Sequence, residues 1–251
     1  MNPTALAHRL HDARLRRRPI GRLTDEVPLD EELAYRIQAE GIRLRLEDGE
    51  RIVGAKLGFT SRAMRRAMGV DHPNYGILTD AMACTSPVSP STFIHPKVEP
   101  EIAFLLEADL GPHATTADVL AATAAVAPCL EIVDSRFRDF SFTALDNIAD
   151  DSSAAGFVLG PRVPVPEDLR LVGVVLEVDG EVAATAAGAA AADHPATAVA
   201  WAARRLAAAG TPLEAGMLVI SGGLTAPVDL VPGRRVACIV DRIGTVELRE
   251  E

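Results

Sequence analysis

The spacing of apolar residues changes near residue 50. Before it, apolar positions recur at helical intervals, and Asp30 is placed to cap a helix that ends near the Asp48–Gly49 turn. From Arg51 onward, short apolar runs alternate with glycine and proline, a pattern typical of β-structure. We therefore expect an α+β protein, with a helical N-terminal extension (residues 1–50) and one β-rich structural unit (residues 51–251).

The β-rich part contains several short apolar runs bounded by turn-forming residues. The predicted strands are Ile52–Gly58, Glu101–Glu107, Leu130–Asp134, Gly156–Leu159, Leu171–Val178, Met217–Ser221, Arg235–Val240 and Gly244–Leu248. Two helices interrupt them. A capping box at Thr115 and Asp118 predicts a helix that runs to Ala127. Pro195 begins the second helix, which ends before Gly210.

Composition narrows the class of protein. The 251 residues are 48% hydrophobic, which is enough for one sizeable core. A net charge of −10, with no long basic stretch beyond Arg14–Arg18, argues against nucleic acid as a partner. No apolar run is long enough to span a bilayer, so we expect no membrane partner. Three widely separated cysteines, Cys84, Cys129 and Cys238, fit reduced thiols and a cytoplasmic location.

Three glutamates form the strongest candidate for chemistry. Glu99 and Glu101 are one residue apart, and alternate residues of a strand point to the same side. Glu131 follows in an apolar stretch, where a charge needs a partner. An all-oxygen ligand set suits Mg²⁺ or Mn²⁺ rather than zinc. The alternative is that Glu99 and Glu101 form the solvent face of an edge strand and that Glu131 pairs with an arginine.

Other polar residues lie inside apolar segments. Lys56 is in a glycine-flanked strand, where it either reaches the surface or is held inside by acidic partners. Asp80 also lies among apolar residues, and Arg136 ends the strand that carries Glu131. The Ser221–Thr225 turn contains two glycines, which would let a ligand approach the backbone closely. No G-x-S-x-G elbow or helical histidine pair is present in the sequence.

Taken in order, several stretches match one known family. They are Lys56–Ser61, Met68–Pro73, Tyr75–Met82, His95–Phe104, Pro128–Arg136, Ala149–Ser153 and Ser221–Pro232. This ordered set resembles the fumarylacetoacetate hydrolase superfamily, specifically its branch of 2-keto-4-pentenoate hydratases and 2-oxo-3-hexenedioate (4-oxalocrotonate) decarboxylases. The resemblance runs from about Ile52 to the C-terminus, and more loosely through the N-terminal helices.

The resemblance implies a fold and a site. The fold would be a mixed β-sandwich roll with flanking helices and a helical N-terminal region, with the metal site at the open mouth of the roll. Glu99, Glu101 and Glu131 would bind Mg²⁺ (or Mn²⁺), and Lys56 would be the catalytic lysine beside the bound 2-oxo acid. The substrate-binding candidates are Leu57, Asp80, Ser153 and Thr225.

Within the branch, we expect decarboxylation of 2-oxohex-3-enedioate to 2-hydroxypenta-2,4-dienoate and CO₂, a step of aromatic meta-cleavage catabolism. The stretches Phe93–Lys97, Phe140–Phe142 and Gly222–Ala226 look more like those of decarboxylases. The alternatives are a 2-hydroxypenta-2,4-dienoate hydratase, an acylpyruvate hydrolase and a non-catalytic partner of a pathway enzyme. The resemblance also implies a homo-oligomer and association with a cognate dienoate hydratase.

Two further points concern single residues. Arg136 could receive the distal carboxylate of the substrate, but we expect it to pair with Asp134 instead. Asp151 and Asp193 depart from the family pattern, in which asparagine and glycine are usual at these positions. Both departures bear on substrate placement and not on the metal ligands.

Overall fold

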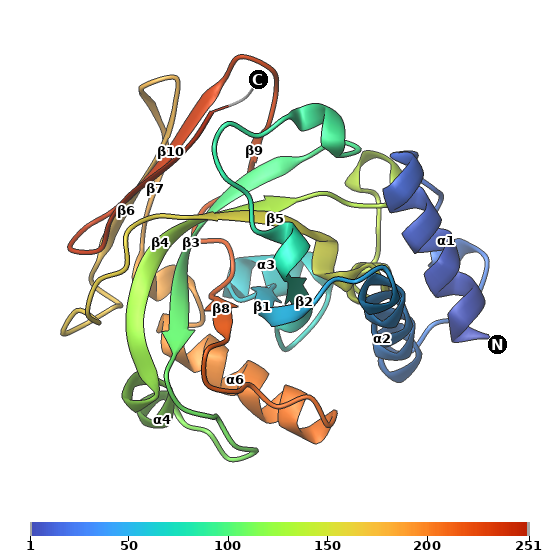
Figure 1. The fold of residues 1–251 in the computed structure, drawn as a ribbon, viewed down its shortest axis with the longest axis horizontal. Helices are drawn as coiled ribbons and strands as arrows, with labels where there is room; N and C mark the ends of the chain where they lie inside the picture. The colour runs from blue at the N-terminus through green and yellow to red at the C-terminus, as the bar shows by residue number, and fades with distance from the viewer. Residues whose placement is uncertain (1, 250–251) are drawn as a thin grey trace.

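The computed structural model describes residues 2–249, which form two β-sheets with helices on the outside (Figure 1). The larger sheet contains β1 (Ile52–Gly58), β2 (Asn74–Thr79), β3 (Lys97–Leu106), β4 (Thr123–Val133), β5 (Ala154–Leu159), β8 (Leu218–Ile220) and β9 (Val228–Asp229). The smaller sheet contains β6 (Gly173–Val178), β7 (Glu181–Ala187), β10 (Arg235–Val240) and β11 (Gly244–Arg249). The helices are α1 (Pro3–Arg16), α2 (Glu31–Glu47), α3 (Arg62–Met68), α4 (Thr116–Ala121), α5 (Ala144–Ala149) and α6 (Pro195–Ala208).

The larger sheet is mixed and curled (Figure 1). Its order is β2-β1-β8-β3-β4-β5, with β9 also paired to β3. Strand β8 lies between β1 and β3; it is parallel to β1 and antiparallel to β3. The smaller sheet, β11-β10-β6-β7, is antiparallel, and β10 and β11 contact β4. The two sheets share a core that includes Phe104, Leu130, Leu176 and Val236. The predicted mixed roll with flanking helices is confirmed.

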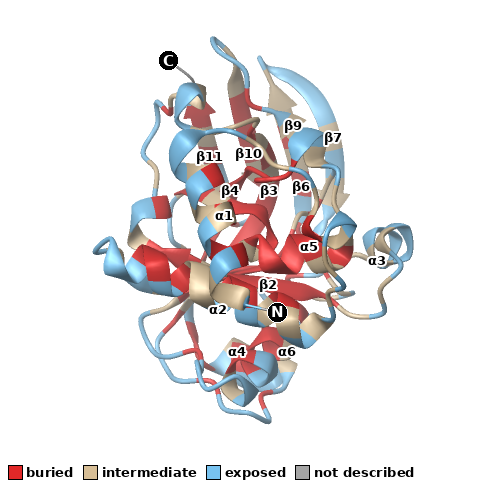
Figure 2. Cartoon of the chain, turned by 90° about the vertical axis from the view of Figure 1, so that its right-hand side faces the viewer, coloured by how far each residue is buried: buried red, intermediate tan, exposed pale blue. Residues whose placement is uncertain are grey.

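Helices cover one end of the roll. The carboxylate of Asp30 caps α2 by accepting the Leu33 N–H at 2.8 Å, as predicted. Helix α1 packs on α2, and α2 packs on α5 through a second core that includes Ile37 and Ile148. Figure 2 shows these buried faces, whereas α3 projects from the body and contains no buried residue. Among residues 2–249, no helix is both long and apolar enough to cross a membrane. The division of the chain at about residue 50 stays a prediction.

Some element boundaries differ from the prediction. The capping box at Thr115 is present, but its helix ends at Ala121, and Thr123 begins β4. The reason is long-range pairing: β4 pairs with β3 along its length, and Val126 and Ala127 are buried in the cores on the two faces of this sheet. Strand β3 begins at Lys97, four residues before the predicted start. The alanine-rich strand β7 was missed, because its residues have weak strand propensity.

Candidate metal and substrate site

Three glutamates converge on one face of the larger sheet. The register of the antiparallel pair β3–β4 places Glu99 directly opposite Glu131. Glu101 is two residues further along β3, so its side chain leaves the same face. One carboxylate oxygen from each residue lies within 4.8 Å of the other two. Glu101 and Glu131 are fully buried, and Glu99 is partly exposed. Two neighbouring strands therefore hold three acids at one point.

The protein supplies few hydrogen-bond donors to these carboxylates. The Gly222 N–H donates to Glu101 Oε2 at 2.5 Å. Glu101 Oε1 and both oxygens of Glu131 are buried and accept no hydrogen bond from residues 2–249. Burial raises the pKa of Glu99 to about 7, and burial together with the Glu131 charge raises the pKa of Glu101 well above its usual range. Buried carboxylate oxygens whose lone pairs accept no hydrogen bond fit a hard divalent cation such as Mg²⁺.

Lys56 is the only cation that the described residues place among these acids. Its side chain on β1 is 3% exposed, and Nζ lies 3.1 Å from Glu131 Oε1. Nζ also donates to the Ser152 carbonyl oxygen at 3.1 Å. Burial alone would lower the pKa of Lys56, but the Glu131, Glu101 and Glu99 charges outweigh it and the pKa is raised. Lys56 is therefore protonated. A divalent cation at this point would favour ionisation of all three glutamates, and the three carboxylates with the one ammonium group would then have a formal charge of −2, which the cation would neutralise.

The glycine turn after β8 packs against the acids. A Cβ atom on Gly223 would lie 2.6 Å from Glu99 Oε2, and one on Gly222 would lie 2.3 Å from Thr60 Oγ1. Gly222 also has a φ of +94°, a conformation that favours glycine. The sequence interpretation was that the turn lets a ligand approach the backbone. In the structure, the glycines make room for Glu99 and for the N–H contact with Glu101.

The predicted substrate contacts are scattered. The Leu57 side chain lies in the apolar core, on the face of β1 opposite Lys56. Asp80 lies at the other end of the β1–β2 pair, where its carboxylate accepts the Arg51 N–H at 2.8 Å and pairs with the Arg51 side chain. The structure therefore does not bring these two side chains to the glutamates. Ser153 Oγ accepts a hydrogen bond from Asn147, and Thr225 Oγ1 donates to the Ala226 carbonyl oxygen.

Arg136 has a different partner from the predicted one. Its buried guanidinium pairs with the Asp150 carboxylate and donates to the Asp134 carbonyl oxygen at 2.6 Å. The Asp134 carboxylate instead accepts the N–H groups of Ile94 and His95, each at 2.8 Å. The expected Arg136–Asp134 side-chain pair is thus corrected to an Arg136–Asp150 pair. Both acids are fully engaged in holding loops next to β3 and β4.

Sequence reasoning missed the residues behind Lys56. Besides accepting the Lys56 hydrogen bond, Ser152 donates through Oγ to Asn74 Oδ1 at 3.0 Å. The Asn74 amide then donates to Asn147 at 2.8 Å. A signal was present at Gly58, because a Cβ atom there would lie 2.2 Å from Asn74 Oδ1 and 2.6 Å from Ser152 Oγ. A glycine inside a strand often marks such a close approach.

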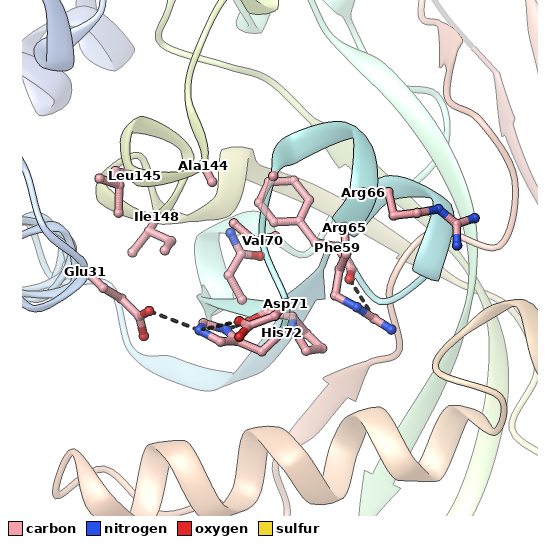
Figure 3. Close-up of a pocket in the computed structure, with 13 residues that line it drawn as sticks. Glu31, Phe59, Arg65, Arg66, Val70, Asp71, His72, Ala144, Leu145 and Ile148 are labelled. Carbon is pink, nitrogen blue, oxygen red and sulfur yellow. Dashed lines mark hydrogen bonds and ion pairs between the residues drawn. The ribbon is translucent and has the colours of Figure 1, made fainter.

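A cavity of about 550 Å³ adjoins this network (Figure 3). Phe59 and Asn74 line it together with the α3 segment and with apolar residues of α5. In Figure 3, His72 points toward Glu31, 3.1 Å away, and Arg65 donates to the Phe59 carbonyl oxygen at 3.2 Å. Asn74 both lines the cavity and contacts Ser152, so this one side chain connects the cavity wall to the turn that holds the Lys56 partner.

Two known enzymes match this chain over nearly its whole length. No family model matches it. It is 39% identical to a 4-oxalocrotonate decarboxylase of Pseudomonas putida, over 98% of this chain and 95% of that protein. It is 41% identical to a 2-keto-4-pentenoate hydratase of Burkholderia vietnamiensis, over 96% of this chain and 95% of that protein.

Solved structures of known enzymes also match this chain. The 4-oxalocrotonate decarboxylase from Pseudomonas putida G7, complexed with magnesium and adipate, superposes with a TM-score of 0.95 at 38% identity. That match covers 99% of this chain and 97% of the other. A fumarylpyruvate hydrolase from Pseudomonas aeruginosa matches with a TM-score of 0.61 at 19% identity, over 78% of this chain and 88% of that one, which shows a shared fold alone.

Proposed function

We propose a function from the premise that this chain belongs to the family of 2-keto-4-pentenoate hydratases and 4-oxalocrotonate decarboxylases, in the fumarylacetoacetate hydrolase superfamily. The protein is a Mg²⁺-dependent decarboxylase that converts 2-oxohex-3-enedioate to 2-hydroxypenta-2,4-dienoate and CO₂. The observation that carries this proposal is the TM-score of 0.95 to a decarboxylase solved with magnesium and adipate. Adipate is a six-carbon diacid, as is the proposed substrate.

The site residues suit this reaction. Glu99, Glu101 and Glu131 would hold the ion, which when bound supplies a Lewis acid for the C1 carboxylate and the C2 carbonyl oxygen of a 2-oxo acid. As the C5–C6 bond breaks, its electron pair forms the C4–C5 double bond, the C3–C4 pair moves to C2–C3, and the carbonyl pair moves onto the C2 oxygen. A proton then adds at that oxygen. Lys56, protonated and buried, stabilises the developing negative charge by a charge-assisted hydrogen bond.

The hydratase is a second candidate, because relatives of this name match the chain equally well. They include the 41% identical protein described above and a 2-hydroxyhexa-2,4-dienoate hydratase of Comamonas testosteroni at 39% identity. The same three carboxylates and Lys56 would serve that reaction, in which water adds to a dienol without a distal carboxylate. The two activities therefore differ in what the pocket accepts, and not in the ligands of the ion.

One experiment distinguishes the two candidates. The purified protein with Mg²⁺ is given 2-oxohex-3-enedioate, and ultraviolet absorbance is followed together with CO₂ release. A second reaction contains 2-hydroxypenta-2,4-dienoate alone. We expect CO₂ from the diacid and slow or no hydration of the dienol. Efficient hydration without CO₂ release from the diacid would replace the decarboxylase by the hydratase.

Association and location are further parts of the proposal. The family resemblance supports a homo-oligomer and a complex with a cognate dienoate hydratase, which would receive the unstable dienol directly. Light scattering of the protein alone, and after mixing with that hydratase, tests both. A cytoplasmic location is supported by Cys84, Cys129 and Cys238, all of which are free thiols.

A further inference from the structure

We propose that Asp151 is a positioning residue for Lys56. It anchors the turn whose Ser152 carbonyl oxygen accepts a hydrogen bond from the Lys56 ammonium group. The inference rests on the proposed function, because it assumes that Lys56 acts on the substrate. It adds a residue behind the site that does not itself reach the substrate.

The turn has an unfavourable backbone. Asp151, Ser152 and Ser153 follow one another with φ values of +51°, +52° and +58°. Residues other than glycine rarely adopt this left-handed conformation, and three in succession persist only when surrounding contacts impose it. The position of the Ser152 carbonyl oxygen therefore depends on what tethers the turn.

Asp151 provides a tether to the strand beside Lys56. Its Oδ1 accepts the Ile77 N–H of β2 at 2.7 Å. Its own carbonyl oxygen packs against Gly76, where a Cβ atom would lie only 2.3 Å away. Gly76 is the cross-strand partner of Lys56 in the β1–β2 pair. Asp151 thus fixes the turn to the strand pair that carries the lysine.

The Lys56 ammonium group has three donors. One donates to the Ser152 carbonyl oxygen at 3.1 Å, and the ammonium group also forms an ion pair with Glu131 Oε1 at 3.1 Å. Its remaining donors are available to the substrate. If the Ser152 carbonyl oxygen moved away, the ammonium group would turn toward the unpartnered oxygens of Glu101 and Glu131. It would then be misplaced for the 2-oxo acid, and small displacements in a closed site can cost rate heavily.

The useful property of Asp151 is its acceptor oxygen and not its charge. Its second oxygen, Oδ2, is buried without a hydrogen-bond partner from residues 2–249. Burial raises the pKa of the carboxyl group to about 7. The Asp150 charge also raises this pKa, whereas the nearby Arg45 and Arg136 charges lower it. An asparagine side chain would keep the oxygen that accepts the Ile77 N–H. Alanine or glycine would remove it.

The test compares Asp151→Asn, Asp151→Ala and Asp151→Gly in the Mg²⁺-loaded enzyme. We expect Asp151→Ala and Asp151→Gly to lower kcat by about 10- to 100-fold while KM and Mg²⁺ affinity change by less than about threefold. Asp151→Asn should stay within about threefold of the wild type. Glycine relieves the strain of a positive φ but supplies no acceptor oxygen. Asp151→Gly therefore distinguishes the effect of the lost hydrogen bond to Ile77 from the effect of backbone strain. Asp109→Ala is the matched control, because Asp109 also accepts one backbone N–H, that of Ala215 at 2.8 Å, on an exposed loop.

Several outcomes would overturn the inference. They are an unchanged kcat in Asp151→Ala, a wild-type kcat in Asp151→Gly, or a loss of activity that only follows the loss of folded protein by circular dichroism. If the wild type hydrates the dienol but does not decarboxylate the diacid, the decarboxylase proposal fails and the same kcat ratios are measured in the hydration assay. A wild type inactive in both assays would overturn the function and the inference together.

Discussion

Two groups of buried acids in this protein are treated in opposite ways. Asp134, Asp146 and Asp150 are buried, and the protein satisfies each of them. Asp146, for example, accepts the Thr24 N–H at 3.0 Å and the Thr143 N–H at 2.9 Å. Glu101 and Glu131 are equally buried, yet between them they accept a single hydrogen bond, from Gly222, while Lys56 faces Glu131 as a charge.

The difference separates the acids that hold loops in place from the acids of the candidate site. A buried carboxylate normally receives donors from the chain, because leaving it unpaired is costly. The aspartates follow that rule and connect loops to strands. The glutamates depart from it at one point of the sheet, where an external cation is the remaining partner. Hydrogen-bond satisfaction, more than burial, therefore distinguishes these two groups of acids.

Among the predictions that test this difference between the acids, the largest expected loss of activity is at Glu101. Glu101→Gln removes one negative ligand and should lower kcat by at least about 10³-fold, because the ion's charge stabilisation is lost. The fold should remain intact, since the amide oxygen can still accept the Gly222 N–H. Steady-state kinetics at saturating Mg²⁺ and circular dichroism check the two parts. Full turnover in excess chelator would contradict the metal site itself.

Lys56 should have the next largest effect. Lys56→Ala removes the charge-assisted contact proposed between Lys56 and the substrate, and should lower kcat/KM by at least about 10²-fold. Lys97→Ala is a suitable control, because Lys97 pairs with Asp229 at the surface. A loss below about threefold would make Lys56 a structural counter-ion of Glu131 and nothing more.

Stability measurements sharpen the contrast between the acids. Asp146→Ala leaves the Thr24 and Thr143 N–H groups unpaired, and should lower the free energy of unfolding by about 1–3 kcal/mol. Glu101→Gln in chelator should cause no such loss, because the neutral amide places no charge beside Glu131 and its oxygen still accepts the Gly222 N–H. Urea denaturation of both variants in chelator tests the pair. Equal destabilisation would show that the two groups of acids do not differ in this way.

The last prediction is a pH dependence of stability at Asp151. Its folded-state pKa of about 7 lies above the usual value of 3.8, so between these values the folded protein keeps a proton that the unfolded chain has lost. Asp151 therefore makes stability fall as pH rises from about 4 to about 7, and has no further effect above that window. Asp151→Asn should gain stability relative to the wild type as pH rises through the window. Urea denaturation at about pH 5 and about pH 8 measures the difference, and parallel curves would refute it.

The sequence predicted those parts of the site that depend on local geometry. Alternation along a strand is enough to place Glu99 and Glu101 on one face, and the apolar setting of Glu131 marks it as unusual. The donors and acceptors behind them could not be found in this way. Gly222, Ser152 and Asn74 meet the site residues through contacts between segments far apart in the chain.

The same distinction between local and long-range contacts explains which parts of the fold were predicted. Helix ends marked by Asp30 and Thr115 follow from local capping and were predicted. The end of the Thr115 helix was not, because pairing with β3 decides that Thr123–Val133 form a strand. Arg136 likewise had two acids within reach, and only the folded loop selects Asp150 over Asp134.

Strand β8 determines when the site can be completed during synthesis. It joins β1 to β3, pairing Gly54 with Leu218 and Ala103 with Ile220, so the nascent chain cannot close the larger sheet until its C-terminal part has emerged. Contacts across such distances form slowly, because a long loop must close first. Until then Lys56 and Glu101 belong to separate sheet fragments, and Glu101 lacks the Gly222 N–H. The candidate metal site is therefore expected to form late in folding, after one three-residue strand has joined the two parts of the sheet.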